Sequence, residues 1–353
     1  MVDRYKKIFF ALMIGIVFSI AVMELLARLL PVSDAFLTEP VDDKNPFLHL
    51  KPNRNVFVSK GPLFENIVGN KWVNNYGYFS DIDYEKNIDQ KKLVLLGSSL
   101  VTAHEVLNKN TIQSNLSKEL DSRHKIYSIA ASGAPQSQYL AYIPYVKEEF
   151  NVSAICIVIG IYDFNHSKYL GNMGSGYFFF DEKNNFELIL DSKKVGIIQS
   201  IAINSALLRY LFLNMEIKRI NFLSRKENSS VEDFSQLAKS KILADQFFKK
   251  LNTELNGIPT LIVLDSTNNN RYGLENSLES EQSFDGIMRA YLIKKAKESN
   301  IEVLNLGPIF YEDFKKNKQR FDFINDNHWN THGHFIAAEN IKKTMTFQNF
   351  IKN

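Results

Sequence analysis

The chain has only one cysteine among its 353 residues, Cys156, in the apolar run AICIVIG. A single cysteine excludes an intramolecular disulfide and any cysteine-rich metal site. We expect Cys156 to be a small buried apolar side chain. Neither sign of charge is in large excess, because 42 basic and 39 acidic residues give a net charge of only +3. No long block of lysine and arginine could follow a phosphate backbone, so we predict no nucleic-acid partner.

Glycine-rich nucleotide motifs are missing as well. The sequence has no Gly-Lys-Ser/Thr of a phosphate-binding loop, and the eight residues after Gly97 contain no further glycine for a dinucleotide fingerprint. We therefore predict no cofactor.

The chain does have a long apolar run near its N-terminus. The 16 residues from Ile8 to Met23 carry no charge, and a membrane-spanning helix takes ~20 residues with a lower limit of ~17. The run from Ile8 to about Leu26 is long enough if Glu24 lies at the far interface.

Basic residues on one side of this run predict its orientation. Arg4, Lys6 and Lys7 precede the run, which places the N-terminus in the cytoplasm and the rest of the chain across the membrane. The alternative is a cleaved signal peptide, for which Ser19 and Ala21 form a loose small-x-small pair. That pair lies inside the apolar run, so we favour an uncleaved, single-pass anchor in the cell membrane with the main domain extracytoplasmic.

Apolar runs alternate with helical patterns over the rest of the chain. Continuous apolar strands that alternate with helices predict a parallel sheet covered on both faces, that is, a three-layer α/β/α domain with about five strands. The predicted strands are 93–97, 126–131, 154–160, 260–265 and 301–307.

The predicted organisation has three parts: an N-terminal tip and anchor over 1–30, an extended lead-in over 31–91, and an α/β domain over 92–353. An insertion over 165–255 is too long for one crossover. Within it, GYFFFDEKNNFELIL predicts a hairpin that turns at 183–185. The apolar stretch that follows predicts a helix packed on the domain or lying against the membrane, because Arg209, Glu216, Lys218 and Arg219 argue against a second span.

The run LVLLGSSLVT ends a predicted strand on Gly97, Ser98 and Ser99. Ligands of open α/β sheets bind beyond the carboxyl ends of the strands, so Ser99 stands where a nucleophile is useful. The Gly-x-Ser-x-Gly elbow is excluded because Val101 occupies its last position. The alternative is that the two serines cap the helix that follows.

A serine nucleophile needs a histidine base that is held by an acid. The C-terminal segment FINDNHWNTHGHFIAAENIKK supplies Asp326 and His328 before a predicted helix, at the same edge of the sheet as Ser99. The alternative is that His328 caps that helix and Asp326 serves a turn. His328 and His332 are four residues apart, which suits a metal, but no third ligand has sensible spacing, so we predict no metal site.

LLGSSLVT and DNHWNTHGH together resemble the first and last sequence blocks of the SGNH/GDSL hydrolase superfamily. YSIAASGAPQSQYL is similar to the second block and VIGIYDFN to the third. The resemblance covers about residues 92–345 and implies a flavodoxin-like α/β/α fold. It also implies Ser99 as nucleophile, His328 as base, Asp326 as its acid, and an oxyanion hole that includes the N–H groups of Ser99 and Gly133.

The sequence departs from the family pattern at three points. Ser98 stands where the family has aspartate. Asp326 lies two residues before His328, whereas the commoner spacing is three and would select Asn325; the Asp-x-His-Trp spacing resembles some polysaccharide-modifying members. Tyr162 replaces an oxyanion-hole asparagine, and loss of one such donor costs ~10²–10³ in rate. The Tyr162 hydroxyl or the Asn165 amide are the candidate replacements.

These residues and the resemblance predict an esterase that removes acyl groups, most simply acetyl, from an envelope or exported polysaccharide through an acyl-enzyme. The partners are then an acylated carbohydrate and the membrane. One alternative is an O-acyltransferase that uses the same triad and a membrane protein as acyl donor. The other is a non-catalytic glycan-binding or assembly protein on a degenerate hydrolase fold, supported by Tyr162 and by the missing aspartate of the first block. Sugar stacking is the alternative role of Trp329 and of the aromatic run 177–180, which we expect to be packing residues.

Overall fold

The computed structural model describes residues 2–86, 89–160, 164, 171, 174–194, 201, 203–215, 235–266, 272–273, 282–324 and 326–352. The chain divides into two compact units. We call residues Met1–Leu37, Asn55–Lys71 and Val195–Lys226 the anchor unit, and residues Thr38–Arg54, Trp72–Lys194 and Glu227–Asn353 the sheet unit.

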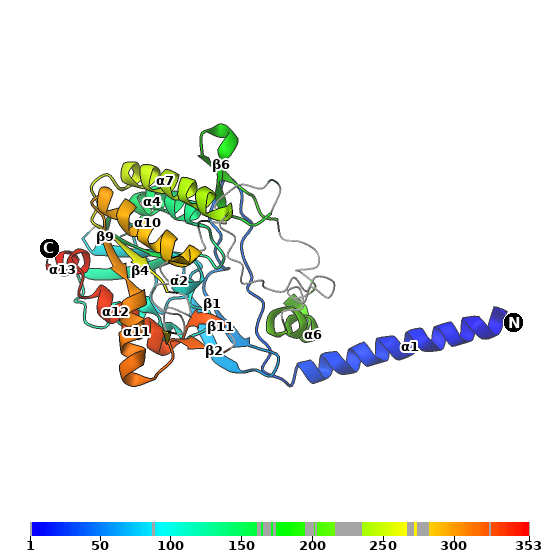
Figure 1. Ribbon diagram of the computed structural model, residues 1–353. Coiled ribbons are helices and arrows are strands. Elements are labelled where there is room, and N and C mark those ends of the chain that lie inside the picture. Colours follow the sequence, from blue (N-terminus) through cyan, green and yellow to red (C-terminus); the bar gives the residue numbers. More distant parts are fainter. Residues whose placement is uncertain are drawn as a thin grey trace. The chain divides into compact units, whose positions relative to one another are not determined.

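The sheet unit is built on a five-stranded sheet in which every neighbouring pair is parallel (Figure 1). The strand order is β4-β3-β5-β8-β9, the flavodoxin-like order in which the first strand along the chain lies between the second and the third. All five strands predicted from the sequence are present, which confirms the predicted fold class. Their bounds are β3 (Lys91–Gly97), β4 (His124–Ala130), β5 (Val152–Ile159), β8 (Thr260–Leu264) and β9 (Glu302–Asn305).

The apolar strands bury side chains on both faces of the sheet. Along β3, Val94 and Leu96 belong to one apolar cluster while Leu93 and Leu95 belong to the other, because successive side chains of a strand point to opposite faces. The first cluster is completed by helices α4 (Gln136–Phe150), α7 (Ser235–Leu255) and α10 (Phe284–Glu298). The second is completed by α3 (Ile112–Ser117), α11 (Leu306–Asn317), α12 (Thr331–Ile341) and α13 (Met345–Lys352).

Cys156 lies in the second cluster and is fully buried. Burial raises the pKa of its thiol above the ordinary value, so the residue has the apolar role expected from its sequence context.

Two short antiparallel pairs complete the described part of the sheet unit. Strands β6 (Phe178–Asp181) and β7 (Glu187–Leu190) form the predicted hairpin. Its turn contains the 3-10 helix η3 (Glu182–Asn184) followed by Asn185 in the left-handed region with φ 51°. Strands β10 (Asp322–Phe323) and β11 (Asp326–Trp329) form the second pair, immediately before α12.

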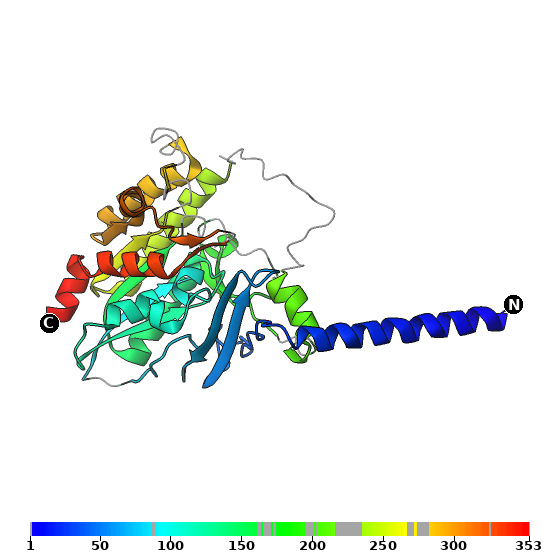
Figure 2. The same cartoon turned by 90° about the horizontal axis from the view of Figure 1, so that it is seen from below.

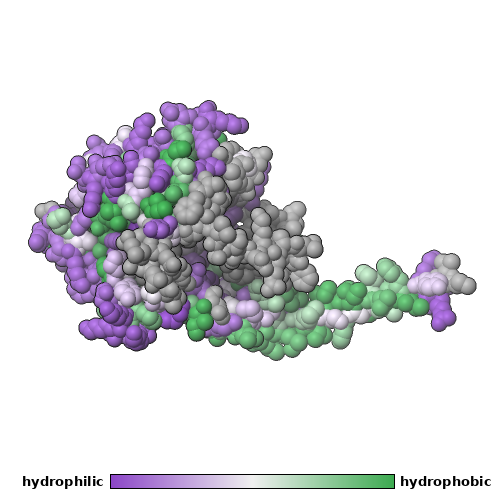
Figure 3. Space-filling view, viewed as in Figure 1, coloured by the Kyte–Doolittle hydropathy of each residue, from purple (hydrophilic) through white to green (hydrophobic). Residues whose placement is uncertain are grey.

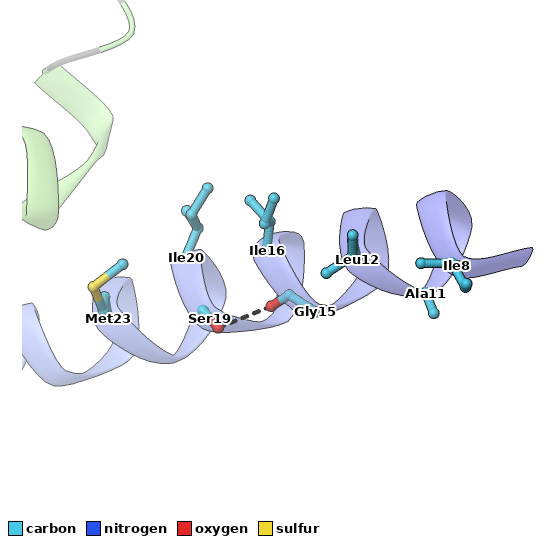
Figure 4. A pocket seen from close by; sticks show the side chains of 8 residues that line it. All are labelled: Ile8, Ala11, Leu12, Gly15, Ile16, Ser19, Ile20 and Met23. Carbon is cyan, nitrogen blue, oxygen red and sulfur yellow. Dashed lines mark hydrogen bonds between the residues drawn. The ribbon is translucent and has the colours of Figure 1, made fainter. Parts of the chain in front are cut away.

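The anchor unit contains the long N-terminal helix α1 (Val2–Ala27). Residues Asp3–Ala27 form a helical stretch that is long and apolar enough to cross a membrane, and its most apolar part is not buried. Figure 3 shows α1 as an apolar surface with hydrophilic residues gathered at its N-terminal tip. On one side of α1 the small residues Ala11, Gly15 and Ser19 line an open groove, and the Ser19 hydroxyl donates to the Gly15 carbonyl at 2.8 Å (Figure 4).

The remaining described elements of this unit are a two-stranded sheet and a short helical segment. Strands β1 (Arg54–Lys60) and β2 (Asn66–Val73) pair side by side (Figure 2). Helix α6 (Ala206–Arg209) continues into the π-helix η4 (Tyr210–Asn214), within the apolar stretch for which the sequence predicts a helix.

Candidate active site

The carboxyl end of β3 turns directly into the one-turn helix α2 (Ser99–Thr102). A Cβ atom on Gly97 would lie 2.5 Å from Cγ2 of Val101 and 3.1 Å from the Val158 carbonyl oxygen. Glycine is therefore required here because α2 folds back over the end of the strand. Ser99 occupies the first position of α2, beyond the strand end, where the sequence predicts the nucleophile.

Ser98 takes the N-cap position of α2, but its side chain makes no capping hydrogen bond. Its backbone carbonyl accepts the Val101 and Thr102 N–H groups instead. The helix-cap interpretation is therefore wrong for the Ser98 hydroxyl.

Asp326 and His328 lie on β11, two residues apart. Residues i and i+2 of a strand point to the same face, so this spacing places the carboxylate beside the imidazole. Oδ1 of Asp326 is in close hydrogen-bond contact with Nδ1 of His328 and accepts the His328 backbone N–H at 3.1 Å. The strand conformation thus explains why a spacing of two works where the commoner family spacing is three.

This contact assigns the two ring nitrogens of His328. A carboxylate accepts a proton at Nδ1, so Nδ1 is the N–H donor and Nε2 remains as the basic nitrogen. The His328 side chain is 29% exposed and that of Asp326 is 24% exposed. The imidazole is therefore oriented by a partly covered carboxylate and stays partly exposed.

Glu105 is a second carboxylate at this imidazole, and the sequence gives no signal for it. Its Oε1 lies 3.5 Å from Nδ1 of His328, and its side chain is only 3% exposed. Helix α2 ends at Ala103, which adopts the left-handed conformation with φ 52° and donates its N–H to the Ser99 carbonyl. The chain therefore turns after a single helical turn, and Glu105 follows two residues later.

In the described structure the three residues of the predicted triad lie at one edge of the sheet, but they are not all joined by hydrogen bonds. Asp326 and His328 are joined directly, and α2, which begins at Ser99, is in contact with β11. Among the described residues no hydrogen bond joins the Ser99 hydroxyl to the imidazole. Catalytic hydrogen bonds are often long without substrate, so the triad assignment stays a prediction.

Trp329 fixes β11 to the sheet. Its indole N–H donates to Asp265 Oδ1 at 2.8 Å, just after the carboxyl end of β8, and its ring packs on Phe310. With an exposed fraction of 1%, Trp329 is a packing residue and not a sugar-stacking one. The aromatic residues of the run 177–180 are likewise mostly buried.

The simpler interpretations of the C-terminal histidines are wrong. Asn330, and not His328, caps α12, because its side chain accepts the His332 and Gly333 N–H groups. His332, the other histidine of the possible metal pair, contacts Asp313 Oδ2 with its Nε2 at 2.8 Å, and its ring stacks on Phe321.

One group of side chains in the described ranges has the spacing of a metal site. A single potential ligand atom from each of Glu105, Asp326 and His328 lies within 4.8 Å of the others. Two of these residues, Asp326 and His328, belong to the candidate triad, and the two roles exclude each other at His328, because an Nδ1 that donates a proton to Asp326 has no lone pair for a metal.

Gly133 lies in the turn after β4, the strand beside β3. Gly97 pairs with Ala130, so the segments that follow the two strands leave the sheet at the same level. Gly133 is exposed and has a φ of 84°, a conformation that favours glycine. Its N–H is thus placed at the edge where the oxyanion hole is predicted.

Tyr177, which the sequence singles out only as part of the aromatic run 177–180, holds this turn. Its hydroxyl donates to the Ser132 carbonyl at 2.6 Å. Tyr177 is 8% exposed, and burial raises the pKa of its hydroxyl to about 12, so the group stays a hydrogen-bond donor over the whole neutral and mildly alkaline range.

The other two predicted oxyanion-hole residues, Tyr162 and Asn165, lie outside the described residues, as does Asn325. Their roles stay predictions.

Comparison with known proteins gives no sequence relative. No family model matches the chain, and no curated protein matches it.

Solved structures give remote similarities. A lipolytic protein of the G-D-S-L family from Veillonella parvula shares 10% identity over 72% of this chain and 98% of its own, with a TM-score of 0.40. The acetyl xylan esterase AlAXEase shares 12% identity over 71% of this chain and 97% of its own, with a TM-score of 0.39. TesA shares 10% identity over 73% and 99%, with a TM-score of 0.41.

Proposed function

We propose that the chain is a serine esterase with Ser99 as nucleophile. His328 takes the proton of the Ser99 hydroxyl on Nε2 while the serine oxygen forms a bond to the ester carbonyl carbon. The N–H groups of Ser99 and Gly133 donate to the oxyanion that develops. His328 then returns the proton to the leaving alcohol, and a water molecule repeats the sequence to release the acid and free Ser99.

The observation that carries this proposal is the contact between Asp326 and Nδ1 of His328 on a strand that touches the helix beginning at Ser99. An oriented imidazole beside a serine at the carboxyl edge of a parallel sheet is the arrangement that general-base activation of a hydroxyl needs. Asp326 stabilises the imidazolium that forms, and the nearby Glu105 adds a second negative charge.

The proposed substrate is an O-acyl, most simply O-acetyl, ester of an envelope or exported polysaccharide. The support is the sequence resemblance to polysaccharide-modifying members, together with the apolar helix α1, which is long enough to cross a membrane. The proposed location is the cell membrane, with the N-terminus in the cytoplasm and the sheet unit outside it.

The test uses the full-length chain in detergent micelles. We expect it to hydrolyse an activated acetyl ester and to be labelled covalently by a serine-directed fluorophosphonate. Ser99→Ala should abolish the labelling and lower the hydrolysis rate by at least ~10³-fold, because the acyl-enzyme can no longer form. Mass spectrometry of the labelled peptide identifies the modified residue.

The matched control is Ser98→Ala, the neighbouring serine, whose side chain makes no capping hydrogen bond. This variant should keep labelling and turnover near those of the unmodified chain. A folded chain that neither turns over ester nor takes the label would refute the esterase. With an acetylated oligosaccharide as substrate, appearance of the acetyl group on another glycan instead of as free acetate would indicate transfer.

A further inference from the structure

The apolar segment around α6 belongs to the anchor unit and is fastened to the end of α1 by Glu24. The two carboxylate oxygens of Glu24 accept hydrogen bonds from the Ser205 hydroxyl at 2.8 Å, the Ala206 N–H at 3.0 Å and the Leu207 N–H at 2.9 Å. Arg28 adds an ion pair at 2.8 Å. The one acidic residue that interrupts the apolar part of α1 is therefore used to hold the start of α6.

The position of Glu24 along α1 sets the depth of this contact in a membrane. Ile8 and Glu24 are 16 positions apart, which is about 24 Å along a helix axis, whereas the hydrocarbon layer is ~30 Å thick. With Ile8 at the cytoplasmic boundary, Glu24 lies at or just inside the outer boundary. Whatever is bonded to Glu24 lies at that level.

The segment held there offers apolar side chains that the anchor unit covers only in part. The sequence ALLRYLFLN over 206–214 is mainly apolar, and most of its side chains are only half-buried in the anchor unit. Ile201, just before it, is 57% exposed. A helix that lies along a membrane buries its apolar side chains at the headgroup boundary.

The side chains of Arg209 and Asn214, the charged and the amide residue of this segment, both have partners inside the anchor unit. Arg209 pairs with Asp34 at 2.7 Å. The Asn214 side chain accepts the Ser33 N–H at 3.3 Å and donates to the Ser59 hydroxyl at 3.0 Å. The segment therefore brings no uncompensated charge to the membrane boundary, where one would be costly.

The turn between β1 and β2 is tied to the same segment. The Tyr210 hydroxyl donates to the Pro62 carbonyl at 2.9 Å, and the Phe64 and Tyr210 rings are 5.7 Å apart. Leu63, which lies between Pro62 and Phe64, is 84% exposed. Leu29, just beyond the end of α1, is 82% exposed. Exposed apolar side chains gathered in this way mark an interaction surface.

We propose that these elements form a membrane-docking surface: Ile201, the segment 203–214 and the Leu63 turn lie in the outer interfacial layer of the phospholipid bilayer that α1 crosses. The proposal rests on the membrane span of α1 and is independent of the esterase chemistry. Continuity with α1 through Glu24 selects a bilayer over a protein partner, because the contact is made where the span reaches the membrane boundary.

The test measures the depth of single labels in the full-length chain, reconstituted in phosphatidylcholine vesicles. The only native cysteine, Cys156, is fully buried, so cysteines introduced by Leu63→Cys or Ile201→Cys can be labelled selectively with an environment-sensitive fluorophore. We expect both labels to be quenched several-fold more by lipids brominated near the headgroup than by an aqueous quencher. Ile16→Cys, in the middle of α1, should be quenched most by lipids brominated deep in the chains.

Met345→Cys in the sheet unit, where Met345 is 71% exposed, is the control for adsorption and should respond mainly to the aqueous quencher. Glu24→Ala should move the Ile201 label toward water and leave the Ile16 label in place. The proposal is overturned if Ile201 and Leu63 behave like Met345 while Ile16 is quenched by lipid, which would place the segment in water outside the bilayer. It is equally overturned if Ile16 is not quenched, because the span itself is then absent. Ester turnover of the same samples reports separately on the active site.

Discussion

At the scale of single residues, His328 has two carboxylates of unequal geometry at the same ring nitrogen. Asp326 is in hydrogen-bond contact with Nδ1, whereas Glu105 lies 3.5 Å away, beyond the usual range of an N–H···O bond. Asp326 therefore fixes the tautomer and the ring orientation, and Glu105 acts mainly through its charge in a buried position.

This difference predicts different losses for two isosteric changes. We expect Asp326→Asn to lower kcat by ~10³–10⁴-fold, because an amide favours the wrong tautomer of the imidazole. Glu105→Gln should lower kcat by only ~10–100-fold, the range expected for one lost charge near the imidazolium. Steady-state kinetics of the two full-length variants with an activated acetyl ester measure both losses.

A chelator is the control for the metal interpretation of the same three side chains. Because Nδ1 carries the proton donated to Asp326, prolonged treatment with EDTA should leave the turnover of the unmodified chain unchanged. Loss of activity with EDTA and its recovery with a divalent cation would contradict the triad, as would a larger loss in Glu105→Gln than in Asp326→Asn.

At the scale of elements, the turn that carries Gly133 is supported from the β6 hairpin. Besides the Tyr177 hydrogen bond to Ser132, the Ser137 hydroxyl donates to the Phe178 carbonyl at 2.8 Å, and the Phe178 N–H donates to the Gln138 side chain at 2.7 Å. Strand β6 is thereby fastened to the start of α4, and the turn between β4 and α4 is held between the two.

Removal of one of these hydrogen bonds should weaken the stabilisation of the oxyanion more than it weakens substrate binding. Tyr177→Phe deletes only the hydroxyl, and a net hydrogen bond of ~1 kcal/mol corresponds to about a 5- to 10-fold fall in kcat. We expect the KM to change little, because the oxyanion develops after the substrate has bound.

The matched control is Tyr291→Phe. The Tyr291 hydroxyl joins α10 to Asp245 of α7 at 2.7 Å, so the same chemical change is made outside the candidate site. An equal effect of both variants on kcat, or a fall in the melting temperature of Tyr177→Phe large enough to account for its loss, would show that Tyr177 has only a structural role.

The elements that the sequence predicts well are those whose pattern follows from burial alone. The five strands are continuous apolar runs because both of their faces are covered, and Ser99 and Asp326 could be assigned to one sheet edge from the order of strands and helices. Glu105 could not be predicted, because it approaches His328 only after α2 ends at Ala103, and alanine gives no signal for a left-handed residue. The role of Tyr177 could not be predicted either, because its hydrogen bond to Ser132 joins positions 45 residues apart.

At the scale of the whole molecule, the sheet unit contains many tyrosines that are buried or half-buried. Burial raises the pKa values of Tyr145, Tyr177 and Tyr272 to about 12 each. It also raises the pKa values of Tyr78 and Tyr142 above the ordinary value of 10.0. In the unfolded chain the pKa values of these hydroxyls return to the ordinary value, so folding is coupled to their protonation.

The sign of this coupling predicts alkaline instability. A group whose pKa is higher in the folded state binds its proton more tightly there, so its full contribution to stability is present below pH 10 and is lost as the pH rises through the folded value near 12. We therefore expect the free energy of unfolding of the sheet unit to fall progressively between pH 10 and pH 12. Urea denaturation at a series of pH values, followed by far-ultraviolet circular dichroism, measures this fall. Near-ultraviolet absorbance of tyrosinate should show the buried tyrosines ionising together with unfolding, and ionisation of all tyrosines near pH 10 in a chain that stays folded would contradict the burial of their hydroxyls.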